Sequence, residues 1–118
     1  MADGRMRRVD EAVREVLSDT ITRDLKDPRV GFVTVTAVRT SRDLRHARVY
    51  VSVLGDEPTR AATLQGLRSA HGYLQAAISR ELKLKHTPTL VFEYDETIER
   101  AARLTELIER GTEPGGRV

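Results

Sequence analysis

Basic side chains gathered in short runs are the groups in this 118-residue chain whose types and spacing suggest chemistry. The runs consist of Arg5, Arg7 and Arg8, then Arg42, Arg45 and Arg48, and last Arg80, Lys83, Lys85 and His86. An arginine guanidinium is a planar fork that fits a phosphate, and neighbouring cations gain affinity for a nucleic-acid backbone by releasing its counterions. We therefore predict that these three basic clusters contact RNA.

Each basic cluster also has an ordinary structural explanation, which the sequence leaves open. The first falls at a helix start, where cations are unfavourable, and its alternative is a solvated terminus. The second fits a polar strand face, and the third falls at a helix end, where cations offset the helix dipole. Among the few aromatic residues only Tyr50 is predicted to face outward. We expect recognition of folded RNA by shape and backbone more than by base stacking.

Histidine, cysteine and carboxylate side chains form no catalytic or metal-binding pattern in the sequence. His46, His71 and His86 fall on different predicted elements without a ligand partner at suitable spacing, and the chain has no cysteine. No phosphate-binding glycine loop is visible. We predict a non-enzymatic protein that uses no metal, no cofactor and no small-molecule substrate.

Composition indicates one soluble domain. The chain has 20 basic and 18 acidic residues, so net charge alone says little about a partner. Its length suffices to bury a core without metal or disulfide. No signal peptide or membrane-spanning run is visible, and the lack of cysteine agrees with a reducing compartment. We expect a cytoplasmic protein with no membrane partner.

Hydrophobic spacing predicts the elements that position the cations in the first half of the chain. Apolar residues recur every three or four positions over residues 5–26, which indicates a helix that ends at Asp27-Pro28 because proline cannot continue it. Alternation over 30–39 and 46–54 indicates an antiparallel hairpin. In its first strand the alternation places Val33, Val35 and Ala37 on one face and Thr34, Thr36 and Val38 on the other.

A glycine interrupts the helical spacing of the second half. The spacing begins near Pro58 and resumes after Gly72, and glycine inside a helix costs about 1 kcal/mol relative to alanine. We predict two helices that meet at a kink over Ala70 and Gly72, where glycine lets another backbone approach closely. The remaining chain is predicted to form a strand, a helix and a disordered tail over residues 89–94, 98–108 and 111–118.

The predicted order is α-β-β-α-α-β in one α+β domain over residues 1–110. A right-handed crossover of two helices brings the third strand parallel to the second. The result is a three-stranded mixed sheet covered by helices on one face. The other face is expected to be at least partly open, and it carries Thr34, Thr36, His46, Arg48, Tyr50, Thr89 and Glu93.

Four segments carry a family resemblance. They are Asp27-Pro28-Arg29-Val30 before Val33-Thr34-Val35-Thr36, Ser41-Arg42-Asp43-Leu44 before the second strand, Ala70-His71-Gly72-Tyr73-Leu74, and Leu82-Lys83-Leu84-Lys85 before Thr87-Pro88-Thr89-Leu90-Val91-Phe92. In this order, over residues 5–108, the chain resembles the bacterial ribosome-binding factor A family. The resemblance implies a KH-like fold of the second type, in which an Ala-x-Gly kink at Ala70 and Gly72 replaces the nucleotide-clamping GxxG loop. The chain contains no GxxG.

The resemblance also implies a function. Such a factor binds the free small ribosomal subunit and its rRNA late in assembly, acts in rRNA maturation and supports growth in the cold, without catalysis. We expect a monomer. The residues themselves leave open an alternative from another class, a protein-interaction module that docks a partner through the open sheet face. Salt discriminates the two, since RNA binding weakens steeply as salt rises while apolar docking responds little.

Overall fold

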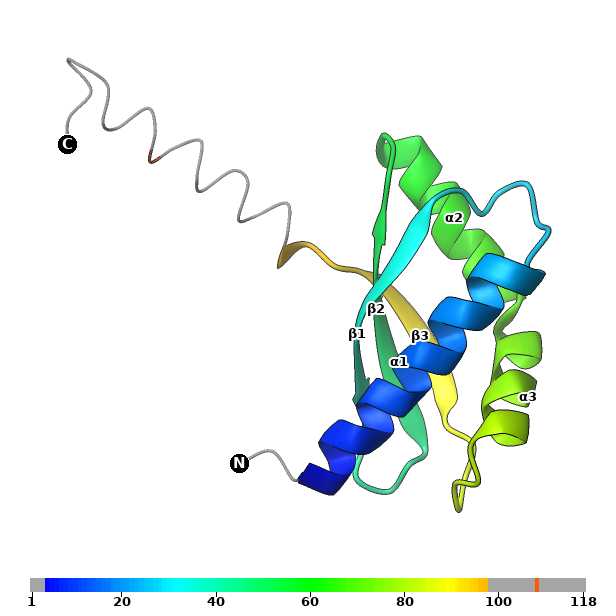
Figure 1. Cartoon of the computed structure of the whole chain (residues 1–118). Helices are drawn as coiled ribbons and strands as arrows, with labels where there is room; N and C mark the ends of the chain where they lie inside the picture. The colour runs from blue at the N-terminus through cyan, green and yellow to red at the C-terminus, as the bar shows by residue number, and fades with distance from the viewer. Residues whose placement is uncertain (1–3, 98–107, 109–118) are drawn as a thin grey trace.

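The computed structural model describes residues 4–97 and residue 108 (Figure 1). Its elements are α1 (Gly4–Asp24), β1 (Val33–Thr40), β2 (His46–Val53), α2 (Glu57–Ser69), α3 (His71–Glu81) and β3 (Thr89–Tyr94). The predicted order α-β-β-α-α-β is confirmed. The helix and tail predicted over 98–108 and 111–118 lie outside the described residues, apart from Ile108, which is helical.

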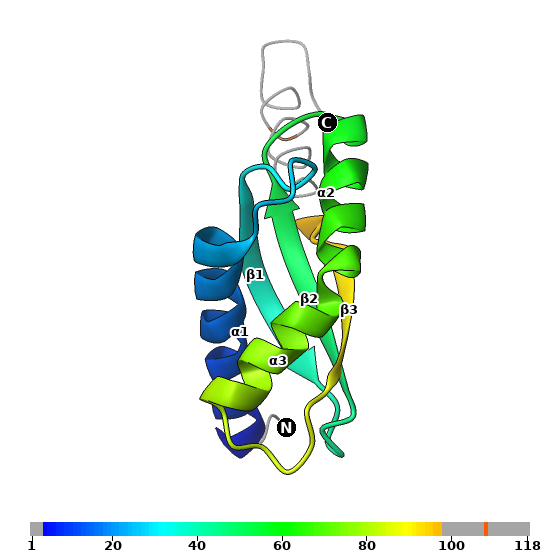
Figure 2. The same cartoon turned by 90° about the vertical axis from the view of Figure 1, so that its right-hand side faces the viewer.

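The three strands form one mixed sheet with β2 in the middle. β1 pairs with β2 antiparallel, and β3 pairs with β2 parallel, as predicted for the crossover through two helices. All three described helices lie on one side of this sheet, which Figure 2 views from the helical side. The predicted α+β class and the single helical layer are therefore confirmed, and no helix among the described residues covers the other face.

Apolar side chains from every helix and strand meet between the helices and the sheet. Burying each one stabilises the fold by about 1.5–3 kcal/mol relative to leaving it exposed. This core fixes α1 and α3 on the sheet, and so fixes the ends of the elements that carry the basic clusters. Its fully buried members include Val13 and Leu17 of α1, Leu67 of α2, Leu74 and Ile78 of α3, Val49 and Val51 of β2, and Phe92 of β3.

A β-bulge in β1 changes which side chains face the core. The strand register shifts between Val35 and Ala37, so Thr36 is an extra residue. Beyond the bulge Val38 is buried, while Arg39 is exposed. The predicted alternation is wrong for Ala37 and Val38, because counting with a strict period of two has no place for an inserted residue.

One residue, Ala70, separates the two crossover helices. α2 ends at Ser69, α3 begins at His71, and the two helices run in different directions (Figure 2). The predicted kink is confirmed in this segment. Gly72 itself lies in the first turn of α3, and a Cβ added to it would meet nothing within 4 Å. The expectation that Gly72 admits a close backbone approach is therefore wrong.

Gly66 of α2, and not Gly72, lies where a neighbouring segment approaches a crossover helix closely. An added Cβ there would lie 2.7 Å from Val30 Cγ2 and 3.4 Å from Arg29 Cβ. The turn that follows α1 packs on α2 at this point, where the Thr63 hydroxyl donates to the Arg29 carbonyl at 3.2 Å. A side chain at position 66 would push the turn away from α2.

Candidate nucleic-acid interface

Three segments that are distant in sequence meet at one end of the molecule. They are the start of α1, the β1–β2 turn over residues 41–45 and the α3–β3 loop over residues 82–88 (Figure 1). A groove of about 320 Å³ lies between them. We call it the basic groove and define it by its lining residues Arg5, Met6, Val9, Arg42, Leu44, Lys83, Leu84 and Lys85.

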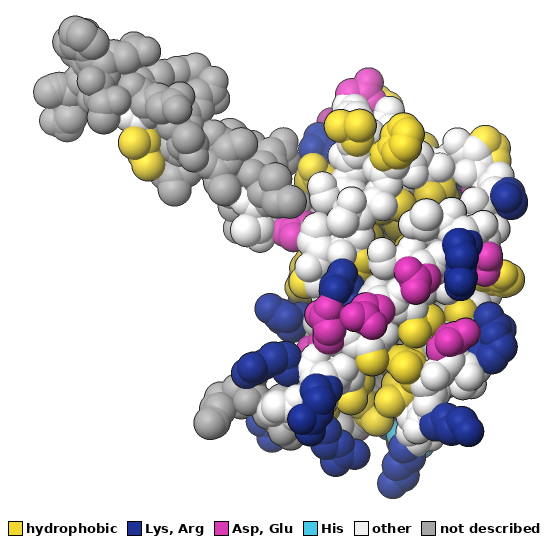
Figure 3. Space-filling view, viewed as in Figure 1, with side chains coloured by type: hydrophobic (Ala, Val, Ile, Leu, Met, Phe, Trp, Pro, Cys, Tyr) yellow, Lys and Arg dark blue, Asp and Glu magenta, His cyan; other side chains and the backbone are white. Residues whose placement is uncertain are grey.

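The basic groove combines an apolar floor with a cationic rim. Its four apolar lining residues are half-buried, and its four cationic ones are exposed. No acidic side chain among the described residues lines it. Figure 3 shows lysine and arginine side chains, in dark blue, gathered at this end of the molecule. Cations held close together repel one another, so an anion in the groove would be stabilised.

Hydrogen bonds hold the walls of the basic groove together. The Asp10 carboxylate accepts a hydrogen bond from the Thr40 N–H at 2.9 Å, which ties α1 to the end of β1. The Arg45 carbonyl accepts one from the Thr89 N–H at 2.8 Å, which ties the β1–β2 turn to the start of β3. Pro88, the residue before β3, is fully buried. The sheet and α1 therefore determine the shape of the groove.

A hydrogen-bond network around Ser41 shapes the turn that presents Arg42 and Leu44. The Ser41 hydroxyl donates to Asp43 Oδ1 at 2.7 Å, and the same oxygen accepts the Arg45 N–H at 3.1 Å. These bonds, led by the one from Ser41, lower the pKa of Asp43 below its ordinary value. Leu44 has a φ of 62°, a left-handed conformation that bulky residues rarely adopt. Strain of this kind clusters at functional sites, and here it lies on the groove floor.

Sequence comparison assigns the chain to a family over nearly all of its length. A profile of the ribosome-binding factor A family matches residues 5–108. The chain belongs to the ribosome-binding factor A family. Ribosome-binding factor A of Halothermothrix orenii is 46% identical over 106 residues, which cover 90% of this chain and 87% of that protein.

Solved structures from the ribosome-binding factor A family have the same fold. The crystal structure of the Thermus thermophilus protein is 31% identical and superposes with a TM-score of 0.67, covering 75% of this chain and 94% of that one. A homology model of T. thermophilus ribosome-binding factor A was fitted into a cryo-EM map of its complex with the 30S subunit. It has a TM-score of 0.62 at 31% identity and covers 73% of this chain and 90% of that one.

The ten RNA-contacting residues predicted for this member of the ribosome-binding factor A family are all exposed. The basic groove gathers four of them and includes at least one from each cluster. Arg45 and His86 lie on the same turn and loop without lining the groove. Contact with RNA stays a prediction for all ten, and the four in the groove are Arg5, Arg42, Lys83 and Lys85.

The other four predicted residues lie away from the groove. Arg7 lines a separate hollow beside β1, together with acidic side chains of α1. Arg8 and Arg80 are exposed on α1 and α3. Arg48 lies on the open sheet face, where its guanidinium is 3.4 Å from the Glu93 carboxylate. The fold therefore separates members of one cluster that are close in sequence.

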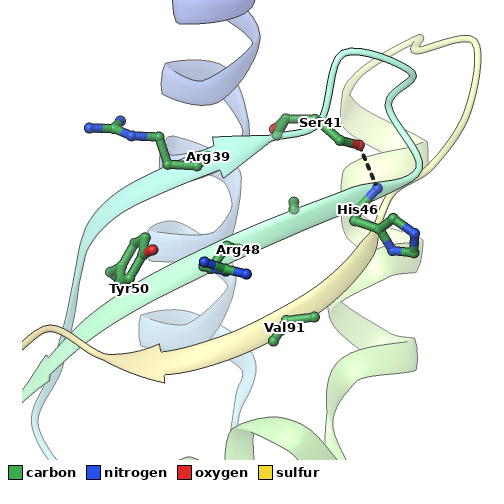
Figure 4. Close-up of a pocket in the computed structure, with 8 residues that line it drawn as sticks. Arg39, Ser41, His46, Arg48, Tyr50 and Val91 are labelled. Atoms are coloured by element: carbon green, nitrogen blue, oxygen red, sulfur yellow. Dashed lines mark hydrogen bonds between the residues drawn. The ribbon is translucent and has the colours of Figure 1, made fainter.

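The sequence pattern fails for one cation and two aromatic residues. Arg39, absent from the predicted set, reaches the open sheet face because of the β-bulge, which no pattern in the sequence marks. Phe32 and Tyr73 are predicted to face inward, and this is wrong because they are 81% and 51% exposed. Tyr50 is half-buried and lies on the open face beside Arg48 (Figure 4).

Histidine and carboxylate side chains are dispersed over the part of the chain that the structure describes. No group of three or more of them there is placed to hold a metal ion. The Nδ1 atom of His71 lies 2.9 Å from the Arg68 carbonyl, a contact within the kinked segment. None of the helices described within residues 4–97 has the length and apolar character needed to cross a membrane.

Proposed function

We propose that this protein is a non-enzymatic assembly factor that binds the free small ribosomal subunit through its rRNA late in maturation and supports the processing of that rRNA. One observation carries the proposal: the basic groove brings cations from three sequence clusters around an apolar floor. The family supports it, since a T. thermophilus relative was fitted into a map of a complex with the 30S subunit.

In this proposal the basic groove holds RNA by its backbone. Arg5 and Arg42 offer planar forks for phosphate oxygens, and Lys83 and Lys85 supply point charges from the facing loop. Each phosphate that a cation neutralises releases counterions, which favours binding most at low salt. The apolar floor excludes water beneath these contacts and strengthens them. Such a site recognises the charge and shape of folded rRNA, because phosphate contacts carry no sequence information.

We further propose the oligomeric state, location and ligand requirements of the active protein. The functional unit is the domain over residues 1–110, which acts as a monomer in the cytoplasm, supports growth in the cold and requires no cofactor or small-molecule substrate. A protein partner docked on the open sheet face is less favoured, because Arg39 and Arg48 lie opposite each other there and a positive pair disfavours apolar docking.

Cosedimentation tests this proposal directly. Purified protein is centrifuged with free small subunits, with large subunits as the control. We expect it to pellet with small subunits only. If the four groove cations each neutralise one phosphate, affinity should fall roughly 50- to 150-fold between about 50 and 200 mM salt.

Two outcomes would contradict the proposal. One is equal pelleting with large subunits, and the other is binding that does not change with salt. The finer claim about processing has its own readout. Depletion of the protein should increase the fraction of unprocessed small-subunit rRNA, and the increase should be larger at low temperature.

A further inference from the structure

The open sheet face carries two arginines directly opposite each other. Arg39 of β1 pairs with Arg48 of β2 in the strand register, and Arg48 pairs in turn with Val91 of β3. Like charges at directly opposed positions destabilise a sheet. Glu93 contacts Arg48 at 3.4 Å, but among the described residues no ion pair joins a carboxylate to Arg39. Arg39 and Arg48 therefore keep an excess of positive charge beside Glu93, and a bound anion would offset it.

The neighbouring row places an aromatic ring beside this pair. Tyr50 lies between Ala37 of β1 and Glu93 of β3 in the register, so its neighbour on β1 is a small residue. A hydrogen bond with the Tyr50 side chain, followed by the charge of Glu93, raises the pKa of Arg48. Arg48 therefore interacts with both Tyr50 and Glu93. Figure 4 shows Tyr50, Arg39 and Arg48 on the same face of the sheet.

Arg39, Arg48 and Tyr50 line a hollow of about 510 Å³ on the open face. Its size is within the range of about 300–1,000 Å³ that small-molecule sites occupy. Val91 of β3, 44% exposed, adds an apolar side chain beside Arg48. Ser41 and His46 close the hollow at the β1–β2 turn, where the His46 N–H donates to the Ser41 hydroxyl at 3.1 Å (Figure 4).

We propose that this hollow binds single-stranded RNA, with one base stacked on Tyr50 and the adjoining phosphate held by Arg39 and Arg48. Proteins bind single-stranded nucleic acid with aromatic rings flanked by cations. An unpaired base can stack its face on such a ring, whereas the bases of a duplex are already stacked on one another. The inference rests on the proposed function, because it assumes that RNA bound in the basic groove continues onto the open sheet face as a single strand.

The β1–β2 turn connects the two sites. Arg42 and Leu44 of this turn line the basic groove, and Ser41 lines the hollow on the open face. A strand whose phosphates lie in the groove therefore needs only to cross the turn to reach Tyr50. If the RNA in the groove were double-stranded, its two strands would have to separate before one of them could reach Tyr50.

Binding of an unstructured oligonucleotide tests the inference. The probe is a fluorescein-labelled RNA of about 12 nucleotides, containing only adenine and cytosine so that it cannot pair with itself. Tyr50→Leu removes the ring, and we expect it to bind the probe about tenfold more weakly than the wild type in fluorescence anisotropy. Tyr50→Phe restores the ring without the hydroxyl and should recover most of this loss.

Phe32→Leu is the matched control, because it removes an aromatic ring that is 81% exposed and lies outside both sites. It should bind the probe as the wild type does. Thermal unfolding of all three variants verifies that each is folded. In NMR spectra of the wild type, the probe should shift the ring signals of Tyr50 and the Nε–H signal of Arg48.

Failure of this inference can be told apart from failure of the proposed function. If Tyr50→Leu and the wild type bind the probe equally tightly, or if the probe shifts no Tyr50 signal, the inference is overturned whatever the subunits do. If the wild type does not pellet with small subunits, the proposed function fails. Weaker probe binding by Tyr50→Leu alone, with recovery in Tyr50→Phe, supports the inference.

Discussion

Asp27 and Arg29 form an ion pair across Pro28 in the turn that leaves α1. The guanidinium lies 2.6 Å from Asp27 Oδ2, and the Arg29 backbone N–H donates to Oδ1 at 2.9 Å. These hydrogen bonds, the side-chain ones first, lower the pKa of Asp27 from 3.8 to about 2. A carboxyl whose pKa is lower in the folded state stabilises the fold above its unfolded pKa. That stabilisation is lost as the pH falls through about 2.

Substitution of Arg29 tests this pair. In Arg29→Gln the pKa of Asp27 should rise toward 3.8, which an NMR titration of its carboxyl carbon measures. The wild type should be more stable than the variant in urea at about pH 5, and the difference should shrink by about pH 2. A wild-type Asp27 that titrates near its ordinary pKa would show that the pair does not form in solution.

Two glycines of the crossover helices have opposite roles. Gly66 lies where α2 packs on the turn after α1, and an added Cβ would be 2.7 Å from Val30 Cγ2. Gly72 lies in α3 with open space around it. Packing against Val30 decides which side chain is tolerated at position 66, whereas at position 72 only helix propensity does.

Alanine at each position tests this difference. Gly66→Ala should lower the free energy of unfolding by about 1–3 kcal/mol, because Val30 must shift. Gly72→Ala should raise it by up to about 1 kcal/mol, because alanine favours the helix. Urea unfolding followed by circular dichroism measures both. A Gly66→Ala variant as stable as the wild type would mean that the turn does not pack tightly on α2.

Most elements could be predicted from the sequence because apolar spacing of period two or near 3.6 reflects one buried face. The bulge at Thr36 could not be predicted, because the residues on both sides of it still alternate as those of a strand do. Position 39 therefore changes face without any local sign. Three basic clusters could be recognised, but which of their members share a groove depends on how the β1–β2 turn and the α3–β3 loop approach each other.

The two ends of the sheet carry different kinds of exposed side chain. The end at the start of α1 carries the basic groove, with the hollow on the open face beside it. At the other end Phe32 and Leu54 are 81% and 75% exposed, and the Leu54 N–H donates to the Phe32 carbonyl at 3.1 Å. This separation predicts that binding to RNA depends on where a cation lies and not on net charge alone.

If cations from separate stretches act together in the basic groove, the salt dependence of subunit binding should reveal it. Two double variants with the same net charge are compared with the wild type. One is Lys83→Gln with Lys85→Gln in the groove, and the other is Arg23→Gln with Lys26→Gln, both exposed toward the far end of α1.

The measurement is the slope of log affinity for small subunits against log salt concentration. The groove variant should lose about 1.4–1.8 from the magnitude of this slope, since each lost phosphate contact removes about 0.7–0.9. The far-end variant should keep the wild-type slope. Equal slopes for the two double variants would show that the cations of the basic groove do not act together on RNA.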